Sequence, residues 1–153
     1  MTEPLDKAAV CAQLNKILEF ELAGVVRYTY YSLMVYGYGR IPIVAWLREQ
    51  ADESLSHAQQ AGELITYLGA HPSLGIGPLL ETHQHNIGDI LRESLEHEQA
   101  ALAHYHQLLA LTQGRSVLLE EYARRLIAAE EAHLGDVDKM LRTPGEVKAF
   151  TAP

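Results

Sequence analysis

Apolar residues recur at steps of three and four positions along most of the chain, which is the spacing of one buried stripe on a helix. Four stretches carry this pattern, near residues 6–36, 42–68, 80–112 and 116–142. The stripe of the last stretch contains Leu119, Tyr122, Leu126, Glu130, His133, Val137 and Met140. No stretch alternates apolar and polar residues as a half-buried strand would. The pattern therefore predicts an all-α protein with four long helices.

Glycine and proline separate the four stretches. The breaks at residues 36–42 and 112–116 are short, so each should join two antiparallel neighbouring helices. The residues that suit the beginning or the end of a helix at these breaks are Pro42, Ser116, Gly37, Gly69 and Gly114. The paired stretches therefore predict a four-helix bundle.

The middle break is longer than the other two. The dozen residues from Gly69 to about Leu80 reach about 40 Å when fully extended, which is enough to run the length of the bundle. We therefore expect a long crossover that makes the second and third helices parallel. A plain up-and-down bundle with a floppy loop is the alternative.

The length and composition agree with one globular domain. The chain has 153 residues, of which 48% are hydrophobic and 21% charged, which excludes a disordered protein. We expect a single domain over residues 1–153, with the bundle at about 6–142 and a short tail at 143–153. Cys11 is the only cysteine, which excludes an internal disulfide and a four-cysteine metal site within one chain.

Charge and hydropathy limit the partners. A formal net charge of −8, without a cluster of Lys and Arg, gives no electrostatic support for nucleic-acid binding. No apolar run approaches the roughly 18 residues that a membrane span needs, and the first residues do not resemble a signal peptide. We expect a cytoplasmic protein that binds neither nucleic acid nor membrane.

Acidic and histidine residues interrupt the apolar stripes near the middle of each stretch. The candidate metal ligands are Glu21, Glu53, His57, Glu98, Glu130 and His133. An ionised carboxylate buried alone costs many kcal/mol, and no Lys or Arg lies on these stripes at that level. Two divalent cations would supply the missing positive charge, bridged by carboxylates and each completed by one imidazole. Such ligands suit Fe(II), Mn(II) or Zn(II).

These residues resemble those of the bacterioferritins and their relatives in the ferritin-like superfamily. The resemblance covers about residues 10–142 and is carried by segments 14–22, 91–98 and 129–133. Tyr28, seven residues after Glu21, matches a tyrosine that the family places beside its metals. The resemblance implies a ferritin-like four-helix bundle with a long crossover between helices two and three. It also implies a pair of iron ions.

The family's ligand roles carry over to the matching positions. Glu21 and Glu98 would be terminal ligands, Glu130 would bridge the two metals, and His57 and His133 would each bind one metal. Tyr28 would be a nearby one-electron donor.

Helix two departs from the family pattern. The family has a glutamate three residues before the histidine, where this chain has Ser54, and the nearest carboxylate is Glu53. Positions three and four residues before His57 both lie on its side of a helix. We therefore expect Glu53 to be the second bridging ligand. The alternative is a surface residue that pairs with a neighbouring charge and leaves a ligand position vacant.

Two further departures concern haem and assembly. The family's haem ligand is a methionine, and this chain has Leu55 at that position, so we predict no haem. Only about ten residues follow Arg142, where the family has a fifth helix, so a 24-subunit shell is uncertain. We expect a homo-oligomer, at least a dimer. The aromatic residues that could form its interface, or simply complete the core, are Tyr30, Tyr31, Tyr36, Tyr38 and Trp46.

Three functions remain open at this point. The first is a ferroxidase, which oxidises Fe(II) with O₂ or peroxide for iron storage and detoxification. The second is a non-storage di-iron oxidase or peroxidase with a fixed metal pair. The third is a structural or interaction bundle whose metal site has lapsed through the change at Ser54.

Overall fold

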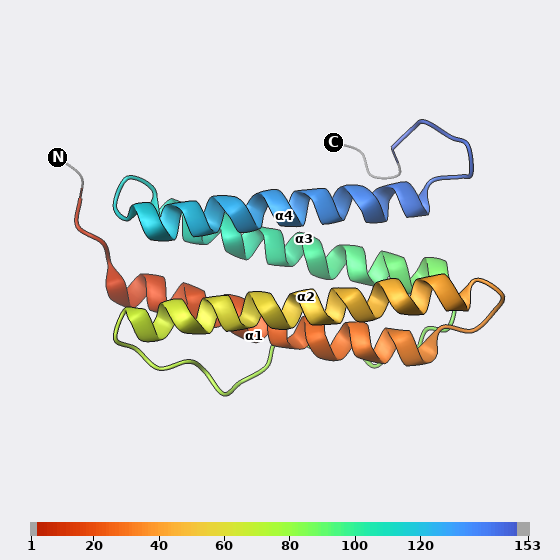
Figure 1. Ribbon diagram of the computed structural model, residues 1–153, viewed down its shortest axis with the longest axis horizontal. Helices are drawn as coiled ribbons and strands as arrows, with labels where there is room; N and C mark the ends of the chain where they lie inside the picture. The colour runs from red at the N-terminus through yellow and green to blue at the C-terminus, as the bar shows by residue number, and fades with distance from the viewer. Residues whose placement is uncertain (1–2, 150–153) are drawn as a thin grey trace.

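A computed structural model describes residues 3–149 and contains four helices in this range. They are α1 (Lys7–Met34), α2 (Arg40–Tyr67), α3 (Ile87–Thr112) and α4 (Val117–Leu141). Figure 1 shows α1 beside α2 and α3 beside α4, with each pair antiparallel. No strand occurs in residues 3–149, so the predicted all-α bundle is confirmed. The predicted tail after residue 142 is described as far as residue 149, and residues 150–153 lie outside the described range.

Polar side chains cap the beginnings of three helices. Ser116 accepts a hydrogen bond from the Leu119 amide at 3.3 Å, as expected for an N-cap. Asp6 and Asn86 cap α1 and α3 in the same way. Pro42 lies in the first turn of α2, where its missing amide hydrogen leaves no helical bond unmade. These local signals place the starts of α2 and α4 within two residues of the prediction.

Left-handed glycines follow the ends of α2 and α3. Gly69 has φ +84° and Gly114 has φ +74°, and each is the first residue after its C-cap. The amides of Gly69 and Ala70 donate to carbonyls in the last turn of α2, which forms a Schellman motif. Gly37 also has a positive φ, but it lies in the turn, two residues beyond the C-cap Val35. The predicted role of Gly37 as a direct cap is therefore wrong, whereas those of Gly69 and Gly114 are confirmed.

The third helix begins later than predicted. It starts at Ile87 rather than near residue 80, with Asn86 as its N-cap. Leu79 and Leu80 look like the start of a helical stripe, but they line a cavity beside Val26 of α1. These residues of the connection are apolar because they lie against α1. In the sequence they therefore look like the first apolar positions of a helix.

The connection at residues 68–86 runs along α1 and forms the predicted crossover. Asn15 accepts a hydrogen bond from the Ser73 amide at 2.7 Å, and the Gly77 amide donates to the Glu19 carbonyl at 2.8 Å. Near the far end of α1, the Tyr36 amide donates to the carbonyl of His85. The chain thus returns to the end where α2 began, and α2 and α3 are parallel (Figure 1).

Replacing Gly77 by alanine is expected to destabilise the protein by about 1–3 kcal/mol. A Cβ at this position would lie 3.1 Å from the Glu19 carbonyl oxygen and 3.2 Å from the Phe20 Cα, both of which are backbone atoms. Chemical denaturation would measure the loss. Gly62→Ala is the matched control, because a Cβ there meets nothing within 4 Å and alanine is the better helix former. Equal stability of the two variants would contradict the predicted close approach.

Three apolar clusters fill the core, and the two largest lie at different levels of the bundle. One contains Leu14, Ile17, Ala61, Ile65 and Tyr105, among others, and the second contains Tyr28, Tyr31, Val35, Leu47 and Ile90, among others. Between these levels, most of the larger side chains that α1 and α2 bury are polar, namely Glu21, Arg27, Ser54 and His57. The bundle therefore has a polar layer in its middle.

The aromatic residues of α1 and α2 divide between core and surface. Tyr31 is buried, and Tyr30 and Trp46 pack against the same apolar cluster. Tyr36 and Tyr38 are exposed. Three of these rings therefore belong to the core or pack against it, whereas Tyr36 stacks on His85 of the crossover and Tyr38 is exposed. None of the described helices is long and apolar enough to cross a membrane.

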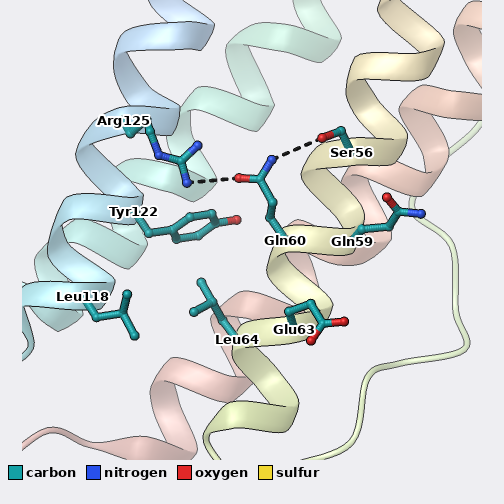
Figure 2. A pocket seen from close by; sticks show the side chains of 8 residues that line it. All are labelled: Ser56, Gln59, Gln60, Glu63, Leu64, Leu118, Tyr122 and Arg125. Carbon is teal, nitrogen blue, oxygen red and sulfur yellow. Dashed lines mark hydrogen bonds between the residues drawn. The ribbon is translucent and has the colours of Figure 1, made fainter.

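The side chains of α2 and α4 leave an open groove between them, called here the α2–α4 groove (Figure 2). Its volume is about 560 Å³. Its lining residues include Ser56, Gln60, Glu63, Leu64, Tyr122 and Arg125. Arg125 donates to the Gln60 side-chain oxygen at 3.1 Å and so links the two walls. The bundle is thus accessible from this face.

Candidate metal centre

Three glutamates from three helices are buried in the polar layer. Glu21 of α1, Glu98 of α3 and Glu130 of α4 are each at most 5% exposed. Each occupies a position of its apolar stripe where the neighbouring helices close around it. His57 of α2 is 8% exposed, and His133 is half-buried one turn after Glu130. Carboxylates at this depth require compensating positive charge or protons.

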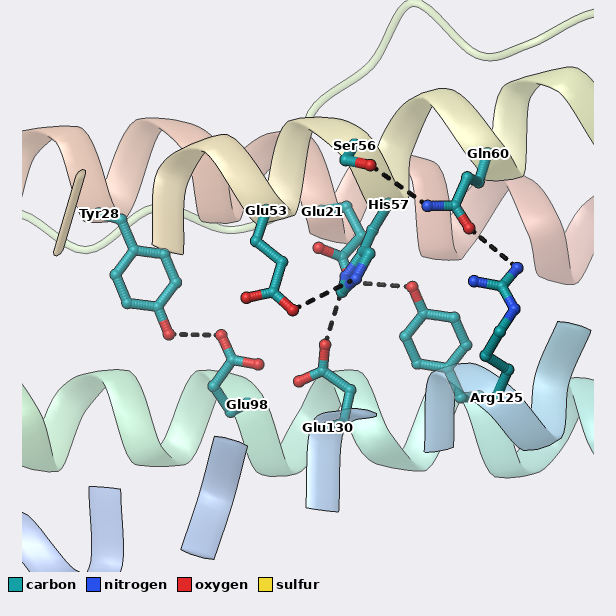
Figure 3. Close-up of polar contacts among 10 residues, drawn as sticks. Glu21, Tyr28, Glu53, Ser56, His57, Gln60, Glu98, Arg125 and Glu130 are labelled. Carbon is teal, nitrogen blue, oxygen red and sulfur yellow. Dashed lines mark hydrogen bonds and ion pairs between the residues drawn. The ribbon is translucent and has the colours of Figure 1, made fainter. Parts of the chain in front are cut away.

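One group of these residues has the geometry of a metal site. The ligand atoms of Glu21, His57 and Glu130 lie within 4.8 Å of one another. His57 Nδ1 is 3.5 Å from Glu21 Oε1 and 3.5 Å from Glu130 Oε1 (Figure 3). Three donor atoms of the types that bind iron, manganese or zinc therefore face one point.

Unpartnered atoms mark the other side of Glu130. Glu130 Oε2 and His133 Nε2 are buried and have no hydrogen-bond partner among the described residues. Glu98 lies close enough to both residues for Glu130 to raise its pKa and His133 to lower it. Buried ligand atoms without partners are rare in folded proteins. Their presence beside a third carboxylate fits a second metal ion at this position.

Burial and mutual repulsion change the acidity of the carboxylates. Burial is the main cause that raises the pKa of Glu98, and the neighbouring Glu130 raises it further. Burial also raises the pKa of Glu21, while His57 lowers it. Without metal, protons therefore replace part of the positive charge that the carboxylates need.

The pKa of His57 is also raised, but for a histidine this favours the charged form. Burial lowers its pKa, but hydrogen bonds to Glu130 and Glu21 outweigh this effect and raise the pKa to about 10. Arg27, the buried guanidinium of α1, does not neutralise the centre directly, because it donates to the Tyr31 hydroxyl and the Glu93 carbonyl. The protonated His57 is therefore the cation that contacts Glu21 and Glu130 in the metal-free protein.

Two buried tyrosines each bind one of the carboxylates. The Tyr28 hydroxyl of α1 donates to Glu98 of α3, and the Tyr105 hydroxyl of α3 donates to Glu21 of α1 at 2.9 Å. Both tyrosines follow a glutamate of their own helix by seven residues. The sequence singled out Tyr28 but not Tyr105. The repeated seven-residue spacing on α1 and α3 was the available signal.

Glu53 lies at the edge of the centre. Its side chain is 47% exposed, and its Oε1 is 3.7 Å from His57 Nε2. Figure 3 shows the carboxylate directed toward His57. Ser54 is buried against α1, because its Oγ would lie 2.9 Å from a Cβ added to Gly24. Glu53 thus faces the other candidate ligands, but it is much more exposed than they are.

A second cavity, called here the Trp46 pocket, leads to the centre between α2 and α4. Its volume is about 310 Å³. It is lined by Trp46, Gln50, Glu53, Ala129, Ala132, His133 and Asp136. Because both Glu53 and His133 lie on its wall, small molecules can approach this side of the centre.

Comparisons with known proteins agree with the fold. The family model described as a ferritin-like domain matches residues 11–144. A dodecameric thioferritin, the bacterioferritin-related protein from Bacteroides fragilis, is 24% identical with a TM-score of 0.81, and the match covers 90% of this chain and 86% of that chain. A ferritin-like, diiron-carboxylate protein from Bacillus anthracis is 20% identical with a TM-score of 0.78, covering 90% and 98%. No curated protein sequence matches.

Proposed function

Because the chain belongs to the ferritin-like domain family, we propose that it is a di-iron carboxylate protein with ferroxidase activity. In this proposal it oxidises Fe(II) with O₂ or peroxide for iron storage and detoxification. The observation that supports it most directly is the buried group of Glu21, His57 and Glu130, next to the unpartnered Glu130 Oε2 and His133 Nε2.

The proposed ligands divide into two sets that share Glu130. Glu21 and His57 would hold one iron, and Glu98 and His133 would hold the other. Glu130 would bridge the pair, and Glu53 would be the second bridging ligand after a change of its side-chain conformation. When bound, the iron pair supplies two electrons as Fe(II) becomes Fe(III). Manganese and zinc suit the same donors, so metal identity is part of the test.

The chain's own residues orient the ligands and control protons. Tyr28 and Tyr105 hold Glu98 and Glu21 by hydrogen bonds, and such second interactions fix a ligand's direction. His57 gives up its proton before its Nδ1 can bind a cation. Tyr28 lies next to Glu98 as the nearest donor of a further electron.

The test is to add excess Fe(II) aerobically to the metal-free protein and to measure the rate of oxidation and the iron retained per chain. Rapid oxidation with many more than two irons retained would support storage. Rapid turnover with only a pair retained would support a fixed-metal oxidase or peroxidase instead. No bound metal at all, by elemental analysis, would support a bundle with a lapsed site.

A fixed-metal oxidase or peroxidase is the second candidate because of the Trp46 pocket. This pocket gives peroxide or a small organic molecule a way to the side of His133. It contains no Lys or Arg, and Glu53 and Asp136 make it acidic. The same features admit Fe(II), so iron retention remains the deciding measurement.

Metal affinity is expected to rise with pH up to about pH 10, the raised pKa of His57. The raised pKa values of Glu21 and Glu98, and the pKa of about 10 for His57, mean that cations must displace protons. Titration with Mn(II) under a weak buffer and a pH indicator would measure both affinity and proton release. An affinity that is independent of pH, with no protons released, would contradict this arrangement.

We further propose a single ferritin-like domain that forms a homo-oligomer, at least a dimer, in the cytoplasm. The structurally similar Bacteroides fragilis protein is dodecameric. Exposed apolar residues of α1 and the crossover offer a contact surface, among them Val26, Leu33, Leu74 and Ile76. Size-exclusion chromatography with light scattering would distinguish a dimer from a larger shell. Haem is not part of the proposal, because Leu55 stands at the family's methionine position.

A further inference from the structure

Tyr105 connects the metal centre to a second buried tyrosine. Its hydroxyl donates to Glu21 at 2.9 Å, and its side chain is 1% exposed. Its ring meets the ring of Tyr122 edge to face, with the ring centroids 6.3 Å apart. Tyr105 lies on α3 and Tyr122 on α4. The pair therefore extends from a proposed iron ligand across the core toward α4.

Tyr122 is where this connection reaches the surface. The residue is 4% exposed, yet its ring forms part of the wall of the α2–α4 groove (Figure 2). Its hydroxyl is buried without a hydrogen-bond partner among the described residues. Arg125 lies over the ring, 5.8 Å from its centroid, and Leu64 and Leu118 flank the same groove. The groove thus offers apolar and hydrogen-bonding contacts next to an aromatic ring.

We propose that Tyr105 and Tyr122 form a redox route that carries an oxidising equivalent from the metal centre to a small hydroquinone-type reductant in the α2–α4 groove. The proposal rests on the iron chemistry proposed above. It differs from the role of Tyr28, which donates to Glu98 and whose ring meets Trp46 edge to face with centroids 6.5 Å apart. Each of the two carboxylates would then have its own tyrosine.

The route is needed when peroxide meets a centre that holds a single Fe(II). Reduction of hydrogen peroxide to two waters takes two electrons and two protons. Fe(II) supplies one electron and becomes Fe(III), and Tyr105 supplies the other together with its hydroxyl proton. The second proton comes from the solvent, and the products are two waters, Fe(III) and the neutral Tyr105 phenoxyl radical. This outcome avoids a free hydroxyl radical.

Of the two tyrosines in this route, Tyr105 is oxidised first because its hydroxyl donates to Glu21. A phenol loses its proton when it is oxidised at neutral pH, so an oxidisable tyrosine needs a proton acceptor, and Glu21 is in place. Tyr122 then gives an electron and a proton to the Tyr105 radical and becomes the radical itself. A hydroquinone in the groove gives an electron and a proton to Tyr122, which leaves tyrosine and a semiquinone.

The first test asks whether Tyr105 carries a radical. Tyr28→Phe serves as the background, so that Tyr28 does not contribute. One equivalent of Fe(II) and then peroxide are added, and electron paramagnetic resonance is recorded on frozen samples. We expect a tyrosyl signal whose yield falls at least about tenfold in Tyr28→Phe/Tyr105→Phe. Ring-fluorinated tyrosine at position 105 should change the hyperfine pattern of the earliest signal, which a purely structural role would not do.

The second test asks whether Tyr122 is the exit. Hydroquinone is the probe, and the decay of the radical signal is the measurement. In Tyr28→Phe/Tyr122→Phe the radical should form but decay at least about tenfold more slowly with hydroquinone than in Tyr28→Phe alone. Tyr28→Phe/Tyr67→Phe is the matched control, because Tyr67 is exposed at the end of α2. Its decay should equal that of the background.

The outcomes separate this proposal from the ferroxidase proposal. Titration with Co(II), followed by its visible absorption, gives the metal occupancy of each variant, and radical yields and decays are compared per bound metal ion at saturation. If the background binds metal and consumes peroxide but the loss of Tyr105 leaves the radical yield unchanged, or the loss of Tyr122 leaves the decay unchanged, the route is wrong and the metal centre stands. If the protein binds no metal, the ferroxidase proposal and the route that rests on it are both wrong.

Discussion

Glu130→Gln is expected to abolish binding of the metal pair and to weaken binding of a single divalent ion by about 100-fold or more. Glu130 Oε1 faces His57, and its Oε2 is buried without a partner on the side of Glu98 and His133. An amide preserves the size of the side chain, but it has one acceptor oxygen and no charge. Anaerobic titration with Fe(II) or Co(II) would measure the stoichiometry and affinity.

Glu131→Gln is the control for this variant. Glu131 lies next to Glu130 on α4 but is exposed, so its loss removes the same charge without removing a ligand. It should bind two metals as the unmodified chain does. Equal binding in Glu130→Gln and Glu131→Gln would show that the buried carboxylates are not a metal centre.

The position of Glu130 could be anticipated from the sequence because two patterns agree there. The stripe of α4 fixes which face is buried, and Glu130 and His133 both lie on it between Leu126 and Val137. The glycines and Ser116 fix where the helices begin and end, which sets the level at which the four helices meet. Helix periodicity and caps are local signals, so a single sequence contains them.

The start of α3 and the position of Glu53 depend on tertiary contacts. Leu79 and Leu80 are apolar whether they belong to α3 or contact α1 from the crossover. Glu53 and Ser54 differ by one position, and only the packing of Ser54 against Gly24 decides which faces α1. The start of α3 and the direction of Glu53 depend on contacts with neighbouring helices, so the periodicity of one segment could not predict them.

The hydrogen bond from Tyr105 to Glu21 shows a different limit of prediction from the sequence. Tyr105 is an ordinary apolar-stripe residue by its spacing, and it does pack in the core. Its hydroxyl reaches a residue 84 positions away, on a helix whose rotation the sequence does not specify. A stripe predicts that a side chain is buried, whereas its polar partner depends on how the two helices are set against each other.

Glu98→Gln is expected to make the metal-free protein more stable while it abolishes the metal pair. The raised pKa of Glu98 means that the folded state binds its proton more tightly than the unfolded state does. This contribution to stability is present below the unfolded pKa of 4.5 and is lost as pH rises toward the folded pKa. Glutamine stays neutral at every pH, and its amide can still interact with Tyr28 and Glu130.

The advantage of the variant should therefore grow with pH. At about pH 8 we expect metal-free Glu98→Gln to exceed the unmodified protein by about 1–3 kcal/mol in the free energy of unfolding, and at about pH 4.5 by little. Thermal unfolding in the presence of a chelator would measure this. Added Mn(II) should raise the melting temperature of the unmodified protein more than that of the variant, which keeps only the Glu21, His57 and Glu130 group.

Glu96→Gln is the matched control, because Glu96 lies two residues before Glu98 on α3 but is exposed. It should leave both the metal-free stability and the effect of Mn(II) unchanged. A Glu98→Gln variant that is less stable than the unmodified protein at about pH 8 would mean that burial does not destabilise the Glu98 carboxylate. In the expected case, the Glu98 carboxylate destabilises the metal-free bundle but is needed to bind the metal pair. A buried acidic centre thus lowers the stability of the fold in exchange for metal binding.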